Sequence, residues 1–165
     1  MKHIKKIYGY PIDIMHMSIK DRSMDYESKR IDNKVIFVIP AAYTYIKGQD
    51  IMLDAILSLP KQYSDQARFL FCGYKVEGQE EYYEKIIKIS EKIECVEHLG
   101  KLNIDEIYQL YANSDCVIAP SRTDPTPTTI VEVIYSNMKM NWIRSMEIPR
   151  NFPICLRNIR RYVQD

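Results

Sequence analysis

The feature that most constrains the fold is a fourfold alternation between short, mostly apolar runs and longer amphipathic segments between residues 34 and 137. Runs of this length, rich in Val, Ile, Phe and Cys, are typical of strands that are buried on both faces. Because strands and helices alternate, we predict an α/β fold in which helices cover both faces of a parallel sheet. The predicted strands are residues 35–39, 67–72, 95–99 and 116–119.

The segments between the runs have helical spacing of apolar residues. Pro60 ends the first helix, because proline cannot continue a helix. Asn103 and Glu106 have the spacing of a capping box at the start of the third helix, whose apolar face would be Ile104, Ile107, Tyr108 and Tyr111. The predicted helices are residues 48–59, 79–92 and 103–112, with a further one beginning near Thr129.

In sheets of this kind, ligands bind beyond the carboxyl ends of the strands. The loops that leave those ends are residues 40–48, 73–78 and 120–128. We therefore expect these three loops to meet on one rim and to carry the functional groups.

The two ends of the chain are harder to assign to helices or strands than its middle. We therefore divide the chain into three parts. Residues 1–33 form an irregular amino-terminal segment, with a strand or short helix near 12–19. Residues 34–137 form the α/β domain, and residues 138–165 form a basic tail that we expect to be helical over 153–163 and to pack on the domain. The basic side chains of the tail fit either a solvated helix face or an interface.

Composition excludes several classes of function. The formal net charge is +1, so no overall field draws the chain to nucleic acid. No stretch approaches the roughly 18 apolar residues of a membrane span, and no long apolar run follows the basic start. We expect a cytoplasmic protein without a transmembrane segment, and a peripheral membrane contact is left open.

Cysteine and histidine spacing gives no metal-binding pattern. None of the four cysteines belongs to a C-x-x-C pair, and three lie in apolar runs, which favours buried reduced thiols over a zinc site or a disulfide framework. The three histidines are scattered along the chain. We therefore predict no bound metal and no cofactor.

Two segments on the predicted rim carry candidate chemistry. Lys47 and Gly48 precede a helix, where free N–H groups and a mobile cation suit an anion, although a surface lysine before a helix is common. Asp124 lies on a loop stiffened by Pro125 and Pro127, and Glu132 follows in the first turns of the next helix. Taken singly, Asp124 fits a turn-forming residue and Glu132 an acid against the helix dipole.

Five segments together resemble a known family. In chain order they are Lys47-Gly48-Gln49-Asp50, Phe69-Leu70-Phe71-Cys72-Gly73, His98-Leu99-Gly100, Ala119-Pro120-Ser121, and Asp124 followed after seven residues by Glu132. Residues 34–133 thereby resemble the carboxy-terminal domain of the group 1 glycosyltransferases. The resemblance implies one Rossmann-like half of the two-domain GT-B fold of these retaining enzymes.

The resemblance also implies roles for single residues. Lys47 matches the lysine that binds the donor diphosphate, Asp124 matches the acid that contacts the donor sugar, and these two are the implied catalytic residues. Glu132 matches the carboxylate that holds the ribose hydroxyls, and Lys101 and Leu102 lie where the base is often placed. The implied donor-binding set is Lys47, Gly48, Gly73, Lys101, Leu102, Ser121, Asp124, Thr128, Thr129 and Glu132.

Three departures from the family pattern bear on activity. The family usually has Gly-Arg where this chain has Ala41-Ala42, so the second diphosphate cation is missing. The first acid is an aspartate, one methylene shorter, and Thr128 follows Pro127 where a glycine is common. The expected last strands are not recognisable in the sequence after Glu132, and a two-domain enzyme needs roughly 350 residues. We therefore expect a fragment, a truncated product or one part of a split enzyme.

The expected function is donor binding in a retaining hexosyltransferase. Combined with an acceptor-binding domain or protein, such a domain would transfer a sugar from a nucleotide diphosphate sugar to a glycan or lipid-linked acceptor in polysaccharide biosynthesis, and this chain is expected to be inactive alone. The alternative is a degenerate, non-catalytic domain that serves as a subunit or interaction partner. A nucleotide-sugar epimerase and a flavodoxin-like phosphoacceptor fit less well, because the former needs a second domain and the latter an acidic cluster near Pro40.

Overall fold

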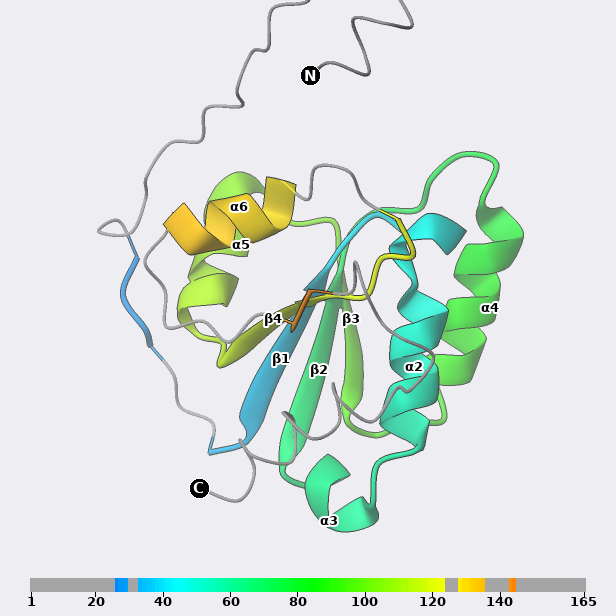
Figure 1. Ribbon diagram of the computed structural model, residues 1–165, viewed down its shortest axis with the longest axis horizontal. Coiled ribbons are helices and arrows are strands. Elements are labelled where there is room, and N and C mark those ends of the chain that lie inside the picture. Colours follow the sequence, from blue (N-terminus) through cyan, green and yellow to red (C-terminus); the bar gives the residue numbers. More distant parts are fainter. Residues whose placement is uncertain (1–25, 30–32, 124–127, 136–142, 145–165) are drawn as a thin grey trace, which may run out of the picture.

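A five-stranded parallel sheet forms the centre of the molecule (Figure 1). The computed structural model describes residues 26–29, 33–123, 128–135 and 143–144. The strand order is β3-β2-β1-β4-β5, and every pair of neighbours is parallel. The strands are β1 (Val35–Pro40), β2 (Ala67–Cys72), β3 (Val96–Gly100), β4 (Cys116–Ala119) and β5 (Ile143–Arg144).

The helices follow the strands in the predicted order, with small shifts at their ends. A 3₁₀ turn precedes the first helix, and an unpredicted short helix follows it, beginning directly after Pro60. Proline thus both separates the two helices and supplies a preset backbone angle for the second. The helices are η1 (Tyr45–Lys47), α2 (Gln49–Leu57), α3 (Lys61–Ser64), α4 (Glu80–Ser90), α5 (Ile104–Ala112) and α6 (Thr128–Tyr135).

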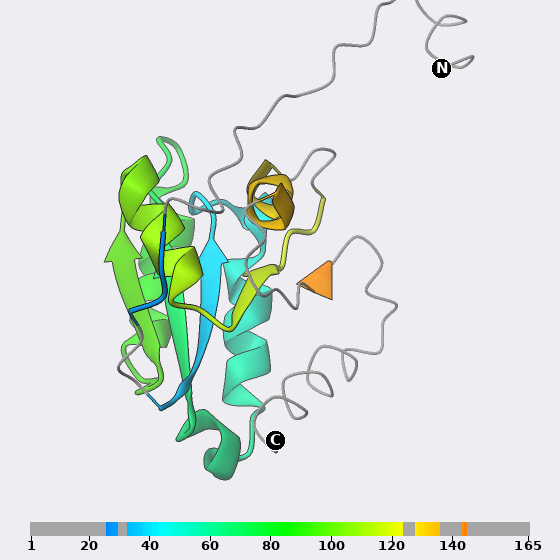
Figure 2. The same cartoon turned by 90° about the vertical axis from the view of Figure 1, so that its left-hand side faces the viewer.

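Each face of the sheet has its own apolar core. Alternate residues of β1 point to opposite sides, so Phe37 and Ile39 pack in one core and Ile36 and Val38 in the other. The first core includes residues of α2 and α4, and the second includes residues of α5 and α6. In Figure 1, α5 and α6 lie on one side of the strands and α2 and α4 on the other, whereas Figure 2 shows the strands spread across the view with α5 in front of them. The predicted α/β fold with helices on both faces is therefore confirmed.

The start of α5 has the predicted cap. The Asn103 side chain accepts hydrogen bonds from the backbone N–H groups of Asp105 and Glu106, and the Glu106 carboxylate accepts one from the Asn103 N–H at 2.7 Å. Tyr108 and Tyr111 are buried as predicted, but Ile104 is 48% exposed. Ile104 is the first residue of the helix and lies at the rim, beyond the sheet that covers the rest of the apolar face.

Regions outside the predicted domain boundaries also contribute to the fold. β5 pairs with β4 although it lies beyond residue 137, where we placed the end of the domain. A strand of two residues carries no periodic signal, so the sequence could not indicate it. In the amino-terminal segment, Tyr26 stacks on Tyr108 of α5 at 5.7 Å between ring centroids. The elements predicted at 12–19 and 153–163 lie outside the described residues.

Candidate functional site

The topology creates one place where a ligand can enter the edge of the sheet. The chain leaves β1 towards β2 on one side, and β4 lies on the other side of β1. In open parallel sheets, this change of direction leaves a crevice at the carboxyl ends of the two central strands. Here those ends are Pro40 and Ala119.

A hollow of about 380 Å³ opens at this edge of the sheet. Ligand pockets usually measure about 300–1,000 Å³, so the hollow can hold part of a nucleotide. It is lined by six of the ten residues that the sequence assigned to the donor site: Gly73, Lys101, Leu102, Thr128, Thr129 and Glu132. The other lining residues are Pro40, Ala41, Ala42, Cys72, Tyr74, Asn103, Ile104, Ile107 and Tyr111.

Polar groups and an apolar wall meet in this hollow. Thr128 and Thr129 begin α6, where backbone N–H groups have no partner within the helix and can donate to an anionic oxygen. The Lys101 ammonium lies over the ring of Tyr74, 5.9 Å from its centroid. Burial raises the pKa of Cys72 to about 12, so this thiol is neutral and contributes apolar surface.

Gly73 is required by the close approach of two strand ends. A Cβ atom on Gly73 would lie 2.0 Å from the carbonyl oxygen of Ala41. Backbone pairing continues past the strand ends, because Ala41 N–H after β1 donates to the Cys72 carbonyl of β2 at 2.9 Å and Gly73 N–H after β2 donates to the Gly100 carbonyl of β3 at 2.8 Å. A glycine here lets the backbone itself form one wall of the hollow.

The predicted Lys47 turn occupies a different part of the rim. Lys47 ends η1, and Gly48 adopts the left-handed conformation with φ of 70° before α2 begins. Neither residue lines the hollow, and a Cβ on Gly48 would lie 2.2 Å from the carbonyl oxygen of Pro120. Ser121 is buried beside this contact, with 7% exposure, and Asp124 lies outside the described residues.

Gln49 connects the Lys47 turn to the wall of the hollow. Its side chain is 1% exposed, and its Nε2 donates to the carbonyl oxygen of Ala42 at 2.9 Å and of Ala41 at 3.4 Å. The first residue of α2 thus fixes the backbone of the loop that leaves β1. The sequence predicted no role for Gln49, because a glutamine at a helix start is usually exposed.

Two further polar groupings near the rim were not predicted. Arg122 forms an ion pair with Asp50, with 2.6 Å between Nη2 and Oδ2. Their opposite charges lie in the first turn of α2 and on the loop after β4, which the topology brings to one rim, and this is the signal that could have identified them.

The second grouping is a chain of hydrogen bonds between Tyr43, His98 and Ser90. Ser90 Oγ donates to the Ile87 carbonyl at 2.7 Å, so it accepts from His98 Nε2–H at 2.6 Å. His98 Nδ1 then accepts from the Tyr43 hydroxyl at 2.5 Å. Burial lowers the pKa of His98, which agrees with a neutral ring in this chain of donors. No sequence signal linked these three positions.

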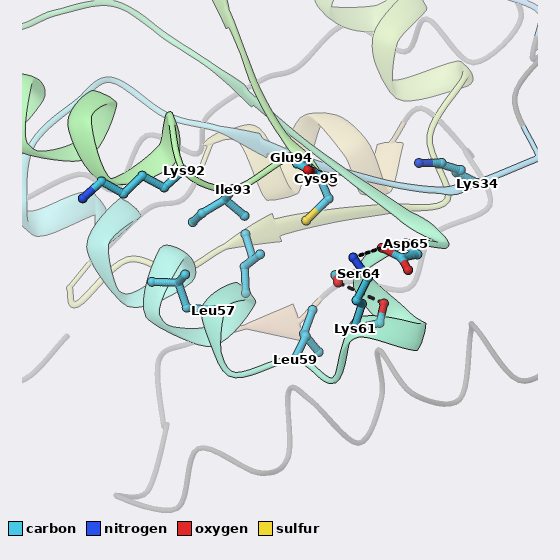
Figure 3. Close-up of a pocket in the computed structure, with 11 residues that line it drawn as sticks. Lys34, Leu57, Leu59, Lys61, Ser64, Asp65, Lys92, Ile93, Glu94 and Cys95 are labelled. Carbon is cyan, nitrogen blue, oxygen red and sulfur yellow. Dashed lines mark hydrogen bonds and ion pairs between the residues drawn. The ribbon is translucent and has the colours of Figure 1, made fainter.

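A second hollow, of about 260 Å³, lies at the opposite edge of the sheet (Figure 3). Its apolar side chains include Leu57, Leu59 and Ile93, and an exposed ion pair joins Lys61 to Asp65 at 3.8 Å. Lys34 precedes β1, so this hollow is at the amino ends of the strands. It therefore lies away from the edge at which parallel sheets bind their ligands.

Two other features, a metal site and a membrane-spanning helix, are absent from the described part of the chain. No group of three or more His, Cys, Asp or Glu side chains there is placed to hold a metal ion. No helix among the same residues has the length and apolar character needed to cross a membrane.

Comparison with known proteins identifies the family. The sequence model of the family described as glycosyl transferases group 1 matches residues 21–139, well over half of the 165 residues. The chain belongs to the group 1 glycosyltransferases. A search of the curated proteins found no significant match.

Solved structures share the fold of this glycosyltransferase domain. The carboxy-terminal domain of the group 1 glycosyl transferase LpcC of Francisella tularensis aligns with a TM-score of 0.59 and 16% identity, over 79% of this chain and 73% of that domain. HepE of Anabaena in complex with UDP and glucose aligns with a TM-score of 0.56 and 23% identity, over 66% of this chain and 29% of HepE. A glycosyltransferase of Rickettsia africae aligns with a TM-score of 0.54 and 17% identity, over 67% of this chain and 29% of that protein. The chain therefore spans under a third of the length of HepE and of the Rickettsia protein. The shared fold confirms the predicted Rossmann-like half of a GT-B enzyme.

Proposed function

We propose that this chain is the nucleotide-sugar-binding domain of a retaining glycosyltransferase and that the rim hollow receives the donor nucleotide. The observation that carries the proposal is the meeting of Gly73, Lys101, Thr128 and Glu132 around one hollow at the carboxyl ends of β1 and β2. Gly73 and Lys101 lie on two different loops, and Thr128 and Glu132 lie on α6; together they provide an anion-binding helix start, a carboxylate and a close backbone wall. Membership of the glycosyltransferase family makes a nucleotide sugar the fitting ligand.

The proposed roles follow from the chemistry of each group. Glu132 is half-buried in the wall, and its carboxylate can accept hydrogen bonds from two ribose hydroxyls. The N–H groups of Thr128 and Thr129 donate to the distal phosphate, and Lys101 with Leu102 contacts the base. Lys47 supplies the cation for the diphosphate from the neighbouring turn, and Asp124 contacts the sugar. No metal or cofactor takes part in this proposal.

The second substrate requires a further domain, which we propose faces the rim. Of the five exposed large apolar side chains among the described residues, four lie on elements at the rim: Tyr45, Ile46, Tyr74 and Ile104. An acceptor-binding domain or protein that covers them would exclude water from the donor. The full reaction would then transfer a hexose with retention to a glycan or lipid-linked acceptor, on the cytoplasmic side where nucleotide sugars are made.

A binding titration tests the donor site. The full chain is titrated calorimetrically with UDP, GDP, ADP and their glucose or mannose derivatives, followed by the variants Lys47→Ala and Glu132→Ala. Removing either charged partner should weaken the tightest nucleotide by about ten-fold or more. The matched controls Lys88→Ala and Glu81→Ala change exposed residues of α4 and should leave binding unchanged.

Two outcomes would contradict the proposal. One is the absence of binding by every nucleotide at millimolar concentration. The other is binding that Lys47→Ala and Glu132→Ala leave as tight as the two control variants.

A non-catalytic subunit is a second candidate, favoured by one observation. Ala41 and Ala42 line the hollow where the family pattern has Gly-Arg, and among the described lining residues the cation is Lys101. Such a domain would bind a partner through the apolar rim without supporting transfer. A stable complex with an acceptor-domain protein that binds nucleotide but transfers no sugar would favour this role over a split enzyme.

A further inference from the structure

The β4–α6 loop is fastened to the Lys47 turn by one side chain. Arg122 donates from Nη1 to Asp50 Oδ1 at 2.8 Å and from Nη2 to Oδ2 at 2.6 Å, so the ion pair is bidentate. Nη1 also donates to the carbonyl oxygen of Tyr45 at 2.6 Å, and the guanidinium lies 3.8 Å from the centroid of the Tyr45 ring. The backbone N–H of Arg122 donates to the Ile46 carbonyl at 2.8 Å. All these contacts reach the segment that contains Lys47.

The other half of the pair is itself anchored to a third element. The Tyr82 hydroxyl of α4 donates to Asp50 Oδ1 at 2.9 Å and accepts from the Asp50 backbone N–H at 3.2 Å. Burial would raise the pKa of Asp50, but the hydrogen bonds from Arg122 and Tyr82 outweigh it and lower that pKa. Asp50 also lies in the first turn of α2, where a negative charge is favoured by the helix dipole.

This ion pair differs from the ordinary ion pairs of a protein surface. The side chains of Arg122 and Asp50 are 27% and 20% exposed. By comparison, Arg68 and Glu97 are 38% and 50% exposed and share a single contact at 2.6 Å. Exposed pairs with one contact contribute little, whereas a bidentate, partly buried pair with an aromatic ring beneath it holds a defined geometry.

The contacts of Arg122 involve residues both before and after Lys47 in the sequence. Tyr45 and Ile46 before it, and Asp50 after it, are all held by Arg122, and Gly48 lies against the carbonyl oxygen of Pro120. The turn that carries Lys47 therefore has its position set by the loop that leads to Thr128. The guanidinium is occupied by Asp50 and Tyr45, so its role is to hold the loops in place.

We propose that Arg122 and Asp50 are positioning residues that clamp the Lys47 turn to the β4–α6 loop, so that Lys47 and the start of α6 can act on the same diphosphate. This inference rests on the proposed donor site. The clamp itself, a fixed distance between two loops, is a property of the free chain and can be measured without nucleotide.

The test combines nucleotide binding with a double-mutant cycle. Arg122→Gln and Asp50→Asn remove the charges with little change of shape, and each is made in the full chain with and without Lys47→Ala. Binding of UDP, GDP and ADP is measured by calorimetry, and unfolding by urea is measured on the same samples. The control Arg68→Gln removes the exposed pair at the start of β2.

The expected result has three parts. Each clamp variant binds the preferred nucleotide about ten-fold more weakly than the parent, and the double clamp variant binds no worse than either single one, because both remove one contact. In the Lys47→Ala background the same changes cost less than two-fold, since a positioning residue acts through Lys47. A merely structural role would weaken binding equally in both backgrounds, and that result would overturn the proposal.

Hydrogen exchange separates failure of the clamp from failure of the donor site. The amide of Arg122 donates to Ile46, and the amide of Lys47 donates to Thr44 at 2.9 Å, so both report on the two loops. The clamp predicts faster exchange of both amides in Arg122→Gln and Asp50→Asn than in Arg68→Gln. Unchanged exchange overturns the clamp even if nucleotide binds, whereas faster exchange in a chain that binds no nucleotide supports the clamp and refutes the donor site.

Discussion

Alanine in place of Gly48 tests the packing of the two rim loops. Gly48 has φ of 70°, and a Cβ atom there would lie 2.2 Å from the carbonyl oxygen of Pro120. Gly100 has nearly the same φ, 69°, with no atom within 4 Å of its Cβ position. Gly73 is the reverse case, because it has no positive φ but its Cβ would lie 2.0 Å from the Ala41 oxygen. Comparing alanine variants at the three glycines therefore separates the cost of backbone strain from the cost of steric contact.

The magnitudes follow from these two terms. An alanine in the left-handed region costs about 1–2 kcal/mol, and the reduced freedom of the unfolded chain offsets about 0.4–1 kcal/mol. Gly100→Ala should therefore lower the free energy of unfolding by about 1 kcal/mol. The contact at Gly73 requires a backbone oxygen to move by more than an ångström, and overpacking of this kind costs about 1–3 kcal/mol. Gly48→Ala carries both terms and should cost about 2–4 kcal/mol.

Urea unfolding of the full chain, followed by circular dichroism, gives the three free energies by linear extrapolation. The expected order is Gly48→Ala most destabilised, Gly73→Ala next and Gly100→Ala least. A loss at Gly48 no larger than the loss at Gly100 would show that Pro120 does not press on this turn. That result would refute the inference that the Lys47 turn packs closely against the β4–α6 loop.

Two further predictions concern the polar network and the helix cap. Burial lowers the pKa of His98 below its ordinary value of 6.5, so the unfolded chain takes up the proton first and stability should fall as the pH drops below 6.5. Urea midpoints measured from about pH 7 to about pH 5.5 should show this fall in the parent chain and a flatter profile in His98→Gln. Equal dependence of the midpoint on pH in the two chains would contradict a buried neutral histidine. Asn103→Ala removes the cap of α5 and should lower the free energy of unfolding by about 1 kcal/mol, while Asn103→Asp keeps the cap and most of the stability; equal losses in the two variants would exclude capping as the cause.

The fold was predictable because its signals are local and repeated. β2 and β4 have the predicted bounds, and the Asn103 cap follows from two residues three positions apart. Both kinds of signal lie within one element and can be recognised without knowing its contacts with distant residues. β5 was missed because a strand of two residues carries no periodic signal, and Ile104 was assigned to the core because helical spacing does not indicate where the sheet beneath a helix ends.

The site was predictable in part, for a related reason. Topology indicated that Gly73, Thr128 and Glu132 would share a rim, and the resemblance added Lys101, which lines the same hollow. The pairing of Arg122 with Asp50 depends on the distance between the loop after β4 and the start of α2, which no single segment encodes. Sequence reasoning therefore indicated what the rim would contain, but not which charges on it are already paired.

The distinction between paired and available charge matters for what the chain can do. Arg122 is held by Asp50, and the carbonyl oxygens of Ala41 and Ala42 are held by Gln49 in the wall where the family pattern has an arginine. In the proposed site Glu132 holds the ribose, away from the bond that breaks, so its contact contributes similarly to the bound donor and to its transition state. A diphosphate cation acts mainly as the leaving group gains charge, so its loss lowers turnover more than affinity. For the proposed donor site we therefore expect the loss of this cation to reduce sugar transfer more than nucleotide affinity.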